Sequence, residues 1–508
     1  MSPSSTCLIR LLDAKLFDNL LTNITYIGNM ATVKSAESVV RPEALSPADE
    51  FGTLNTIGSH AEGALTRKLD LYIVPLIIAS YTLVFLDRSN LGNAKIAGMQ
   101  QDLHLHGTEI NCAVSIFYAT FIFFEIPITL LVKPLGPSKL ISCILLSTSL
   151  VTTFSGFMSN TGSLIACRIF LGITEAASFA VLNYYVSLFW KREEITKRAA
   201  AVYIAVTLSG AFGGLFAWAL TQIDGVPGYA GWRWIFFVEG AISFSWACAS
   251  FFLFPDSPET AHFLNSEEKR LARLRLESQD KDVPFRWSQV VAALKSPICW
   301  LSGFIQLCAS VYYHPLSIFL PTILTGLGYG SLQTQYLIIP VYLFATVMVF
   351  FFAWLADRTQ RRAPIMLFFS LFTIAGYAIL LAWDVPAGVK FFACFLIVGF
   401  GNVLLLLNIA WLNGNIGPRY KRATALAFNQ TISNIGSIIG GQIILDRESP
   451  RYRTGQTVAI SCCGLGCAGV MTLWCLLKSR NARREKLVQE GKEDMGIGDE
   501  SVHFRYQL

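Results

Sequence analysis

The chain has 508 residues, of which 53% are hydrophobic and only 15% are charged. A soluble protein of this length would carry about 25% charged residues, so the composition excludes an ordinary soluble protein and indicates many membrane-spanning segments. The formal net charge of +6 is concentrated in the loops. It therefore reports membrane topology, and no nucleic-acid partner is expected.

The first 66 residues are mostly polar and carry no secretory signal. We expect residues 1–66 to form a disordered cytosolic tail. The twelve cysteines lie mostly inside apolar segments and lack the spacing of a disulfide framework or a zinc site. The sequence therefore predicts neither a metal nor a cofactor.

Twelve apolar segments long enough to cross a bilayer follow, since a span needs about 20 such residues. They cover residues 69–86, 110–132, 139–158, 162–190, 199–221, 232–254, 298–320, 335–356, 364–383, 389–413, 424–445 and 456–477. The longest internal loop separates the sixth span from the seventh. We therefore expect an all-α integral membrane protein with an N-terminal six-helix bundle (67–254), a cytosolic linker (255–297), a C-terminal six-helix bundle (298–477) and a charged cytosolic tail (478–508).

Lysine and arginine predict the orientation. They are frequent in the linker, in the loops that lie on the same side of the membrane as the linker, and after Lys478, whereas residues 159–161, 222–231 and 321–334 have none. Only the first and last loops of the opposite side run against this trend. Because cytosolic loops carry the excess of positive charge, both termini are predicted to lie in the cytosol.

Span four contains two charged residues in an otherwise apolar stretch. Arg168 and Glu175 are seven residues apart, which places both side chains on one helix face, roughly 10 Å apart along the axis. A charged side chain at the centre of a bilayer costs about 2.5–3.5 kcal/mol, so such groups persist mainly where they face a protein interior or a water-filled path. This layout is typical of a site that holds an anion and handles a proton.

The loop after span eight carries a recognisable motif. Residues 353–362 resemble the G-x-x-x-D-R-x-x-R-R loop motif of the major facilitator superfamily, with Ala353 in place of glycine. The motif residues Asp357, Arg358, Arg361 and Arg362 can pair across helix ends in one conformation and separate in another. The equivalent loop after span two departs from the motif. Two sixfold halves around a basic linker also fit the facilitator arrangement, in which two bundles rock about a midplane site.

Four further stretches narrow the family. They are residues 86–94 (LDRSNLGNA), 168–176 (RIFLGITEA), 231–236 (GWRWIF) and 255–261 (PDSPETA). Together they resemble the anion:cation symporter family of the major facilitator superfamily, particularly its fungal allantoate, nicotinate and pantothenate permease-like branch. The resemblance covers about residues 66–480 and implies twelve helices and import of an organic anion with protons.

The resemblance also implies roles for single residues. In relatives, an Asp-Arg pair of span one and the Arg and Glu of span four carry coupling and recognition. By motif, these roles fall to Asp87, Arg88, Arg168 and Glu175. A tyrosine of span two contacts substrate in some relatives; this chain has Phe121 at that position and Tyr118 nearly one turn away. Many relatives have a Pro-Gly pair where this chain has Ala-Val at 180–181, which predicts a straighter span four.

The chemistry of these residues supports such roles. Arg88 and Arg168 can grip a carboxylate through paired hydrogen bonds, and Asp87 and Glu175 can carry the proton. The alternatives are that Asp87 and Arg88 mark the water boundary of span one and that Glu175 forms a structural salt bridge to Arg168.

Weaker candidates for substrate contact are Tyr118, His314 and Asn434. A hydrogen-bonded structural histidine is the alternative for His314, and helix packing is the alternative for Asn434 and its neighbour Asn429. Glu125 is expected to pair at a helix end, and Glu239 is expected to be structural.

The sequence thus predicts a secondary transporter, not an enzyme, that imports a small organic anion by proton symport with alternating access. Its partners would be the anion, protons and the lipid bilayer, and we expect a monomer in the plasma membrane. Two alternatives remain on the same fold. One is a nutrient sensor that binds without net transport, and the other is an exporter or exchanger.

Overall fold

The structure is a computed structural model of the chain. It describes residues 59–106, 108–220, 228–277, 287–382, 384–417, 419–449, 451–490, 501 and 503–508. The chain divides into two compact units, Met1–Ala61 and Glu62–Leu508, and the helices below belong to the second unit from Glu62 onward. Residues 1–58 of the predicted N-terminal tail lie outside the described residues.

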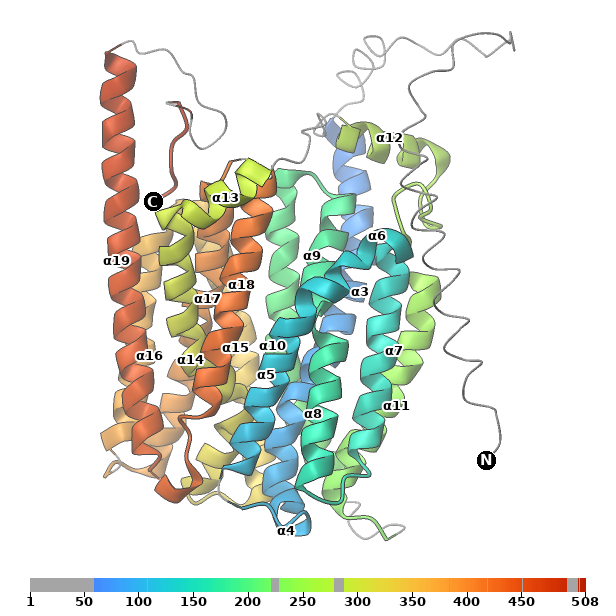
Figure 1. The fold of residues 1–508 in the computed structure, drawn as a ribbon, viewed down its shortest axis with the longest axis vertical. Coiled ribbons are helices and arrows are strands. Elements are labelled where there is room, and N and C mark those ends of the chain that lie inside the picture. The colour runs from blue at the N-terminus through green and yellow to red at the C-terminus, as the bar shows by residue number, and fades with distance from the viewer. Residues whose placement is uncertain are drawn as a thin grey trace, which may run out of the picture. The chain divides into compact units, whose positions relative to one another are not determined.

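The N-terminal half is built from antiparallel helices (Figure 1). Its long elements are α3 (Ser59–Ala94), α5 (Glu109–Leu130), α7 (Pro137–Ser155), α8 (Thr161–Glu175) with α9 (Ser178–Phe189), α10 (Arg192–Leu220) and α11 (Gly231–Leu253). Short elements follow α3 and α5: the π-helix η1 (Lys95–Met99), α4 (Gln100–Asp102) and α6 (Val132–Leu135). Counting α8 and α9 as one span, this part of the described chain has six spans, as predicted.

The C-terminal half repeats the plan after two linker helices, α12 (Ser266–Glu277) and α13 (Trp287–Lys295). Its helices are α14 (Pro297–Gly326), α15 (Ser331–Thr359), α16 (Arg362–Ala382), α17 (Ala387–Asn415), α18 (Arg419–Gly441) and α19 (Arg453–Gln489), with the short 3-10 helix η3 (Asp446–Glu448) before α19. The predicted all-α fold with two six-helix halves is confirmed, and the described residues contain no strand.

Span four, residues 161–189, is a single span with a two-residue turn inside it. Helix α8 ends at Glu175 and α9 begins at Ser178, with Ala176 and Ala177 in a turn between them. Alanine favours helix, and no proline or glycine lies at this point. Both alanines are fully buried, and their backbone angles stay in the right-handed helical region. The break leaves Glu175 at the end of α8.

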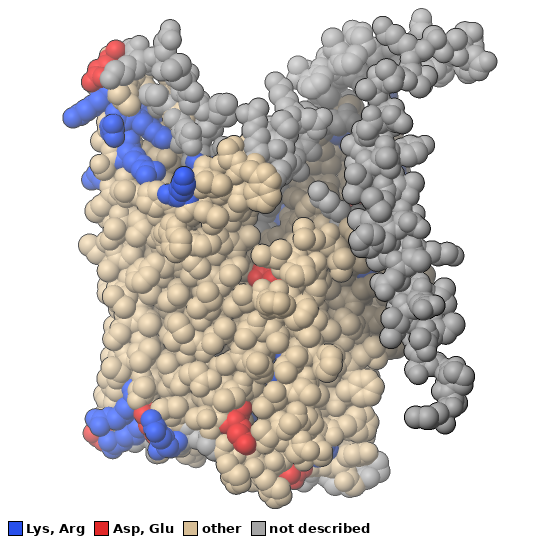
Figure 2. Space-filling view, viewed as in Figure 1, with Lys and Arg blue, Asp and Glu red and all other residues tan. Residues whose placement is uncertain are grey.

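Most of these helices have the composition of membrane spans. Within the described residues, ten are long and apolar enough to cross a bilayer, or eleven if α13 and the first part of α14, bent by 61°, count as one span. The remaining long helix, α18, is more polar because its buried face carries Asn429, Ser433, Asn434 and Ser437. Figure 2 shows the matching surface: on the face drawn, charged side chains gather mostly at the two ends of a broad uncharged band.

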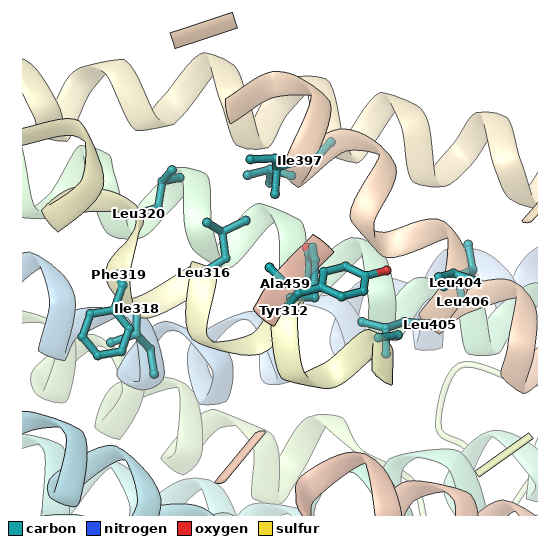
Figure 3. Packing of buried hydrophobic residues seen from close by; sticks show 14 of the residues in the cluster. Tyr312, Leu316, Ile318, Phe319, Leu320, Ile397, Leu404, Leu405, Leu406 and Ala459 are labelled. Carbon is teal, nitrogen blue, oxygen red and sulfur yellow. The ribbon is translucent and has the colours of Figure 1, made fainter. Parts of the chain in front are cut away.

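The buried apolar side chains form two large cores. In the N-terminal half, buried side chains of α3, α7 and α9 meet residues that follow α11, such as Ala261 and Leu264. In the C-terminal half, Tyr312 and Leu316 of α14 lie near Ala459 of α19, with Ile397 of α17 close by (Figure 3). The second core also contains residues of the N-terminal half, such as Phe117 and Trp232, so it joins the two halves.

The two halves meet closely at one end. Figure 1 shows α12 and α13 at one end of the helices, here named the linker end, and α4 at the opposite end. Near that opposite end, the Asn111 amide of α5 donates to the carbonyls of Gly441 (2.7 Å) and Ile444 (2.8 Å). Gly92 of α3 lies so close to α14 that a Cβ would stand 1.8 Å from the Ile318 carbonyl oxygen. This contact between the halves therefore requires glycine.

Candidate functional site

The predicted span-one pair lies inside the protein. Helix α3 continues to Ala94, so Asp87 and Arg88 fall within the helix, where they are 3% and 5% exposed. They do not mark a water boundary. One turn further, Asn90 is fully buried and donates through its Nδ2 to the Glu239 carboxylate of α11.

Arg88 is held by an ion pair and by aromatic rings. Its Nε donates to the Oε2 of Glu175 over 2.8 Å, and the Glu175 side chain is completely buried. The guanidinium also lies over three rings, at 4.7 Å from the centroid of Phe85 and 5.2 Å from those of Phe117 and Phe121. The expected alternative of a Glu175–Arg168 salt bridge is therefore wrong, because the carboxylate of α8 turns to the cation of α3.

Arg168 is buried without such a partner. It is 6% exposed, yet among the described residues no carboxylate oxygen lies within 4 Å of it and no group accepts a hydrogen bond from it. The carboxyls that act on it electrostatically are Asp87 and Glu175. A buried guanidinium with unused donors is costly unless another anion can reach it.

Carboxyl groups outnumber the arginines in this half. The buried acids are Asp87, Glu125, Glu175 and Glu239. Each has one oxygen without a hydrogen-bond partner in the part of the chain that the structure describes. Burying an isolated carboxylate costs far more free energy than burying the neutral acid, so these groups are suited to holding protons. The sequence predicted Glu239 to be structural, and its bond to Asn90 places it one turn from Asp87.

The C-terminal half contributes groups on the other side of Arg88. The buried Tyr118 of α5 lies with its ring centroid 6.2 Å from that of His314 of α14, and its hydroxyl neighbours Arg88. The Nδ1 of His314 is 2.8 Å from the hydroxyl oxygen of Ser437 on α18. The structure thus brings together Tyr118, His314 and the charged pairs of spans one and four.

Two asparagines of α18 differ in their surroundings. Asn434 is buried, and within the described residues its Nδ2 has no hydrogen-bond partner. Asn429 instead donates to the Ser302 hydroxyl over 2.9 Å, which supports helix packing. Sequence reasoning missed Ser437, although it lies one turn after Asn434 on the same polar helix.

The arginines of the motif loop between α15 and α16 differ in burial. Arg358 and Arg361 are exposed, and the Arg358 guanidinium lies 5.4 Å from the Trp354 ring centroid. Arg362 is buried and its Nη1 donates to the Ala410 carbonyl (2.5 Å) and to the Gln507 side chain (2.6 Å). The side chain of Asp357 lies outside the described residues.

A separate cavity lies in the C-terminal half. Its lining includes Tyr312 of α14, Tyr377 of α16 and Gln456 of α19, and contains no charged residue. It offers no side chain that could neutralise a charged ligand, so the charged cluster remains the candidate site.

Known proteins resemble this chain over most of its length. The family model of the Major Facilitator Superfamily matches residues 77–441. An uncharacterized transporter of Schizosaccharomyces pombe is 39% identical over 469 residues, covering 91% of this chain and 94% of the relative. The high-affinity nicotinic acid transporter of Saccharomyces cerevisiae is 30% identical over 490 residues, covering 94% and 91%.

Solved structures agree on the fold. A D-xylose–proton symporter superposes with a TM-score of 0.62 at 13% identity, covering 80% of this chain and 97% of its own. A bacterial homologue of the human lysosomal transporter Spinster gives a TM-score of 0.62 at 16% identity, covering 79% and 96%.

Proposed function

Because the chain belongs to the Major Facilitator Superfamily, we propose that it imports a small organic anion by proton symport with alternating access. The observation that carries this proposal is the buried Arg88–Glu175 ion pair beside Arg168, a second buried cation with unused donors. Such an arrangement offers a substrate anion two guanidinium groups and offers a proton one carboxylate.

Exchange of partners at Arg88 couples the two ligands. A substrate carboxylate accepts hydrogen bonds from Arg88 and Arg168 and displaces Glu175 from Arg88. Glu175 then lies buried without its cation, so it takes up a proton. The net charge of the site is the same before and after, because a carboxylate has entered together with a proton. The site with substrate and proton bound can therefore switch from one side of the membrane to the other without moving an uncompensated charge.

The remaining polar groups complete the cycle. Asp87, whose Oδ2 has no hydrogen-bond partner among the described residues, is a second proton acceptor beside the pair. Tyr118 and His314 supply hydrogen-bonding groups from the two halves, and Asn434 is a further donor from α18. Loss of the proton to a less acidic cytosol restores the Glu175 charge, which competes for Arg88 and releases the substrate.

The surroundings of Arg88 favour an aromatic acid. Phe85, Phe117 and Phe121 lie within about 5 Å of its guanidinium, and the ring of Tyr118 is adjacent. A flat ring carrying one carboxylate can stack on such side chains while its charge meets the arginine. One relative is named as a high-affinity nicotinic acid transporter. We therefore place nicotinate and similar ring carboxylates first among candidate substrates.

The linker end is proposed to face the cytosol, in keeping with its lysine and arginine residues, with a monomer in the plasma membrane. In this orientation the contacts of Asn111 with Gly441 and Ile444 would lie at the extracellular end. The motif residues Asp357, Arg358, Arg361 and Arg362 would then act on the cytosolic side when the halves close there.

Uptake measurements test the proposal. Transporter-deficient cells that express the chain are given labelled nicotinate, allantoate, pantothenate, biotin, small sugar acids and dipeptides at external pH 5 and 7.5, with and without protonophore. We expect one anion to accumulate, faster at pH 5 and only without protonophore. Glu175→Gln should abolish accumulation while leaving binding, because the substrate no longer competes with a charge. The exposed linker acid Glu267, changed to Gln, is the control.

Other outcomes would favour the alternatives. Binding without accumulation would favour a sensor, and efflux or exchange that external acid does not drive would favour an exporter or exchanger. Accumulation by Glu175→Gln with undiminished pH dependence would disprove the assigned coupling residue.

A further inference from the structure

We propose that the groove formed by the ends of α16, α17 and α19 at the linker end is a peptide-binding site, and that its ligand is the chain's own segment 503–508. This inference does not depend on the transported substrate. The segment follows α19 and returns to the C-terminal bundle, where Tyr506 becomes 5% exposed. The sequence itself suggested only a charged tail after residue 477.

Two asparagine side chains form paired hydrogen bonds with the backbone of consecutive residues in the segment. The Tyr506 amide donates to the Asn481 Oδ1 (2.9 Å), and the Asn481 Nδ2 donates back to the Tyr506 carbonyl (2.9 Å). Asn415 treats the next residue in the same way: the Gln507 amide donates to its Oδ1 (2.7 Å), and its Nδ2 donates to the Gln507 carbonyl (3.2 Å). Side-chain amides here satisfy the segment's backbone as a neighbouring β-strand would.

Side chains of the groove select the aromatic residue. The Arg484 guanidinium lies 4.4 Å from the Tyr506 ring centroid, and its nitrogens donate to the Tyr506 hydroxyl (3.1 Å) and to the Phe504 carbonyl (2.9 Å). The indole nitrogen of Trp411 donates to the Gln507 carbonyl over 2.8 Å. The groove thus recognises both an extended backbone and a tyrosine.

The segment also satisfies Arg362 of the loop motif. The Arg362 amide donates to the Leu508 carbonyl (2.9 Å), and its guanidinium donates to the Gln507 side chain (2.6 Å). Arg362 is the first residue of α16, so its amide has no acceptor within its own helix. The segment caps that helix and ties the motif loop to the ends of α17 and α19. Departure of the segment therefore removes two hydrogen-bond acceptors from Arg362, while the bond from its guanidinium to the Ala410 carbonyl stays in place.

Binding in trans tests the proposal. The full chain and a variant lacking residues 503–508 are purified in lipid nanodiscs, and a fluorescent peptide of sequence HFRYQL is titrated into each. The deletion variant should bind the peptide at least tenfold more tightly than the full chain, because a segment on a short tether competes at an effective concentration on the order of millimolar. A peptide with Ala in place of the tyrosine is the matched control and should bind at least tenfold more weakly.

The rate of amide hydrogen exchange is a second measurement, and it does not require the peptide to bind tightly. Deletion should speed exchange at the Arg362 amide at least tenfold, and Asn481→Ala in the full chain should do the same, while amides in the middle of α16 stay unchanged and report an intact fold. Equal peptide binding by the two proteins would overturn the proposal. So would an Arg362 amide that exchanges as slowly without residues 503–508 as with them.

Discussion

At the scale of single residues, the two buried arginines have different consequences for stability. Arg88 neutralises Glu175 at 2.8 Å and covers three aromatic rings, so its removal leaves a buried carboxylate without its cation. Breaking a buried ion pair by removing one partner costs about 3–5 kcal/mol. Arg168 makes neither an ion pair within 4 Å nor a hydrogen bond among the described residues, so its removal breaks no such contact.

This difference gives a prediction. Arg168→Gln should raise the KM for the transported anion at least thirtyfold and leave thermal unfolding in detergent nearly unchanged. Arg88→Gln should abolish uptake and also lower stability by about 3 kcal/mol. Uptake kinetics and thermal unfolding of both variants, expressed to equal levels, check this. A stable Arg88→Gln protein, or normal KM in Arg168→Gln, would contradict the assigned roles.

The sequence named the charged residues of this site but not their partners. Asp87, Arg88, Arg168 and Glu175 were identified from membrane cost and motif, both of which are local properties of the chain. Which carboxylate pairs with which arginine depends on how α3 and α8 pack against each other. The sequence pattern contains no information on that packing. The pair of Arg88 with Glu175, and the place of Ser437 opposite His314, therefore required the structure.

At the scale of elements, hydropathy predicted where the spans lie but not how they bend or dock. The turn at Ala176 and Ala177 that separates α8 from α9 has no signal in the hydropathy pattern. The linker helix α12 likewise appeared as a polar, basic stretch. In the structure Arg275 of α12 is buried and donates to Glu62 (2.8 Å) and Glu194 (2.7 Å), which fixes α12 to the N-terminal bundle.

The docking of α12 should depend on pH only below pH 4.5, the usual pKa of a glutamate. Lys68 of α3 donates to Glu268 of α12 over 2.7 Å, and this bond, together with the amide of Asn265, lowers the pKa of Glu268 below its usual 4.5. A depressed pKa stabilises the docked state above pH 4.5, and that contribution fades as pH falls through the lower folded value. Between pH 7.5 and 5, where uptake is measured, docking should stay constant.

Spin-label mobility measures this. A label at the exposed position Glu267→Cys, in a background without native cysteines, should show constant mobility from pH 7.5 to 5 and greater mobility below pH 4.5. The change should be modest, because a partly exposed ion pair contributes at most about 1 kcal/mol. Lys68→Met is the control, and it should reduce the rise in mobility below pH 4.5. A mobility change between pH 7.5 and 5 would point to another titrating group.

At the scale of the whole molecule, alternating access requires that the halves separate where they now touch. Helices α5 and α18 meet at the end opposite the linker, where a Cβ built on Gly441 lies 3.5 Å from the Cβ of Val114. That spacing is suited to a disulfide, since bonded cysteines have Cβ atoms about 3.5–4.5 Å apart. A bond there would hold this end closed.

We therefore predict that the pair Val114→Cys and Gly441→Cys, in a background without native cysteines, forms a disulfide under oxidation and loses uptake, and that reduction restores it. The matched control is Ser142→Cys with Ser250→Cys, whose hydroxyls are 2.8 Å apart on α7 and α11 of the same bundle. A bond within one bundle moves with that bundle, so its formation should leave uptake near the reduced level. If the cross-bundle bond forms fully and uptake continues, this end stays closed during transport. The rocking of two rigid halves would then have to give way to a smaller movement around Arg88.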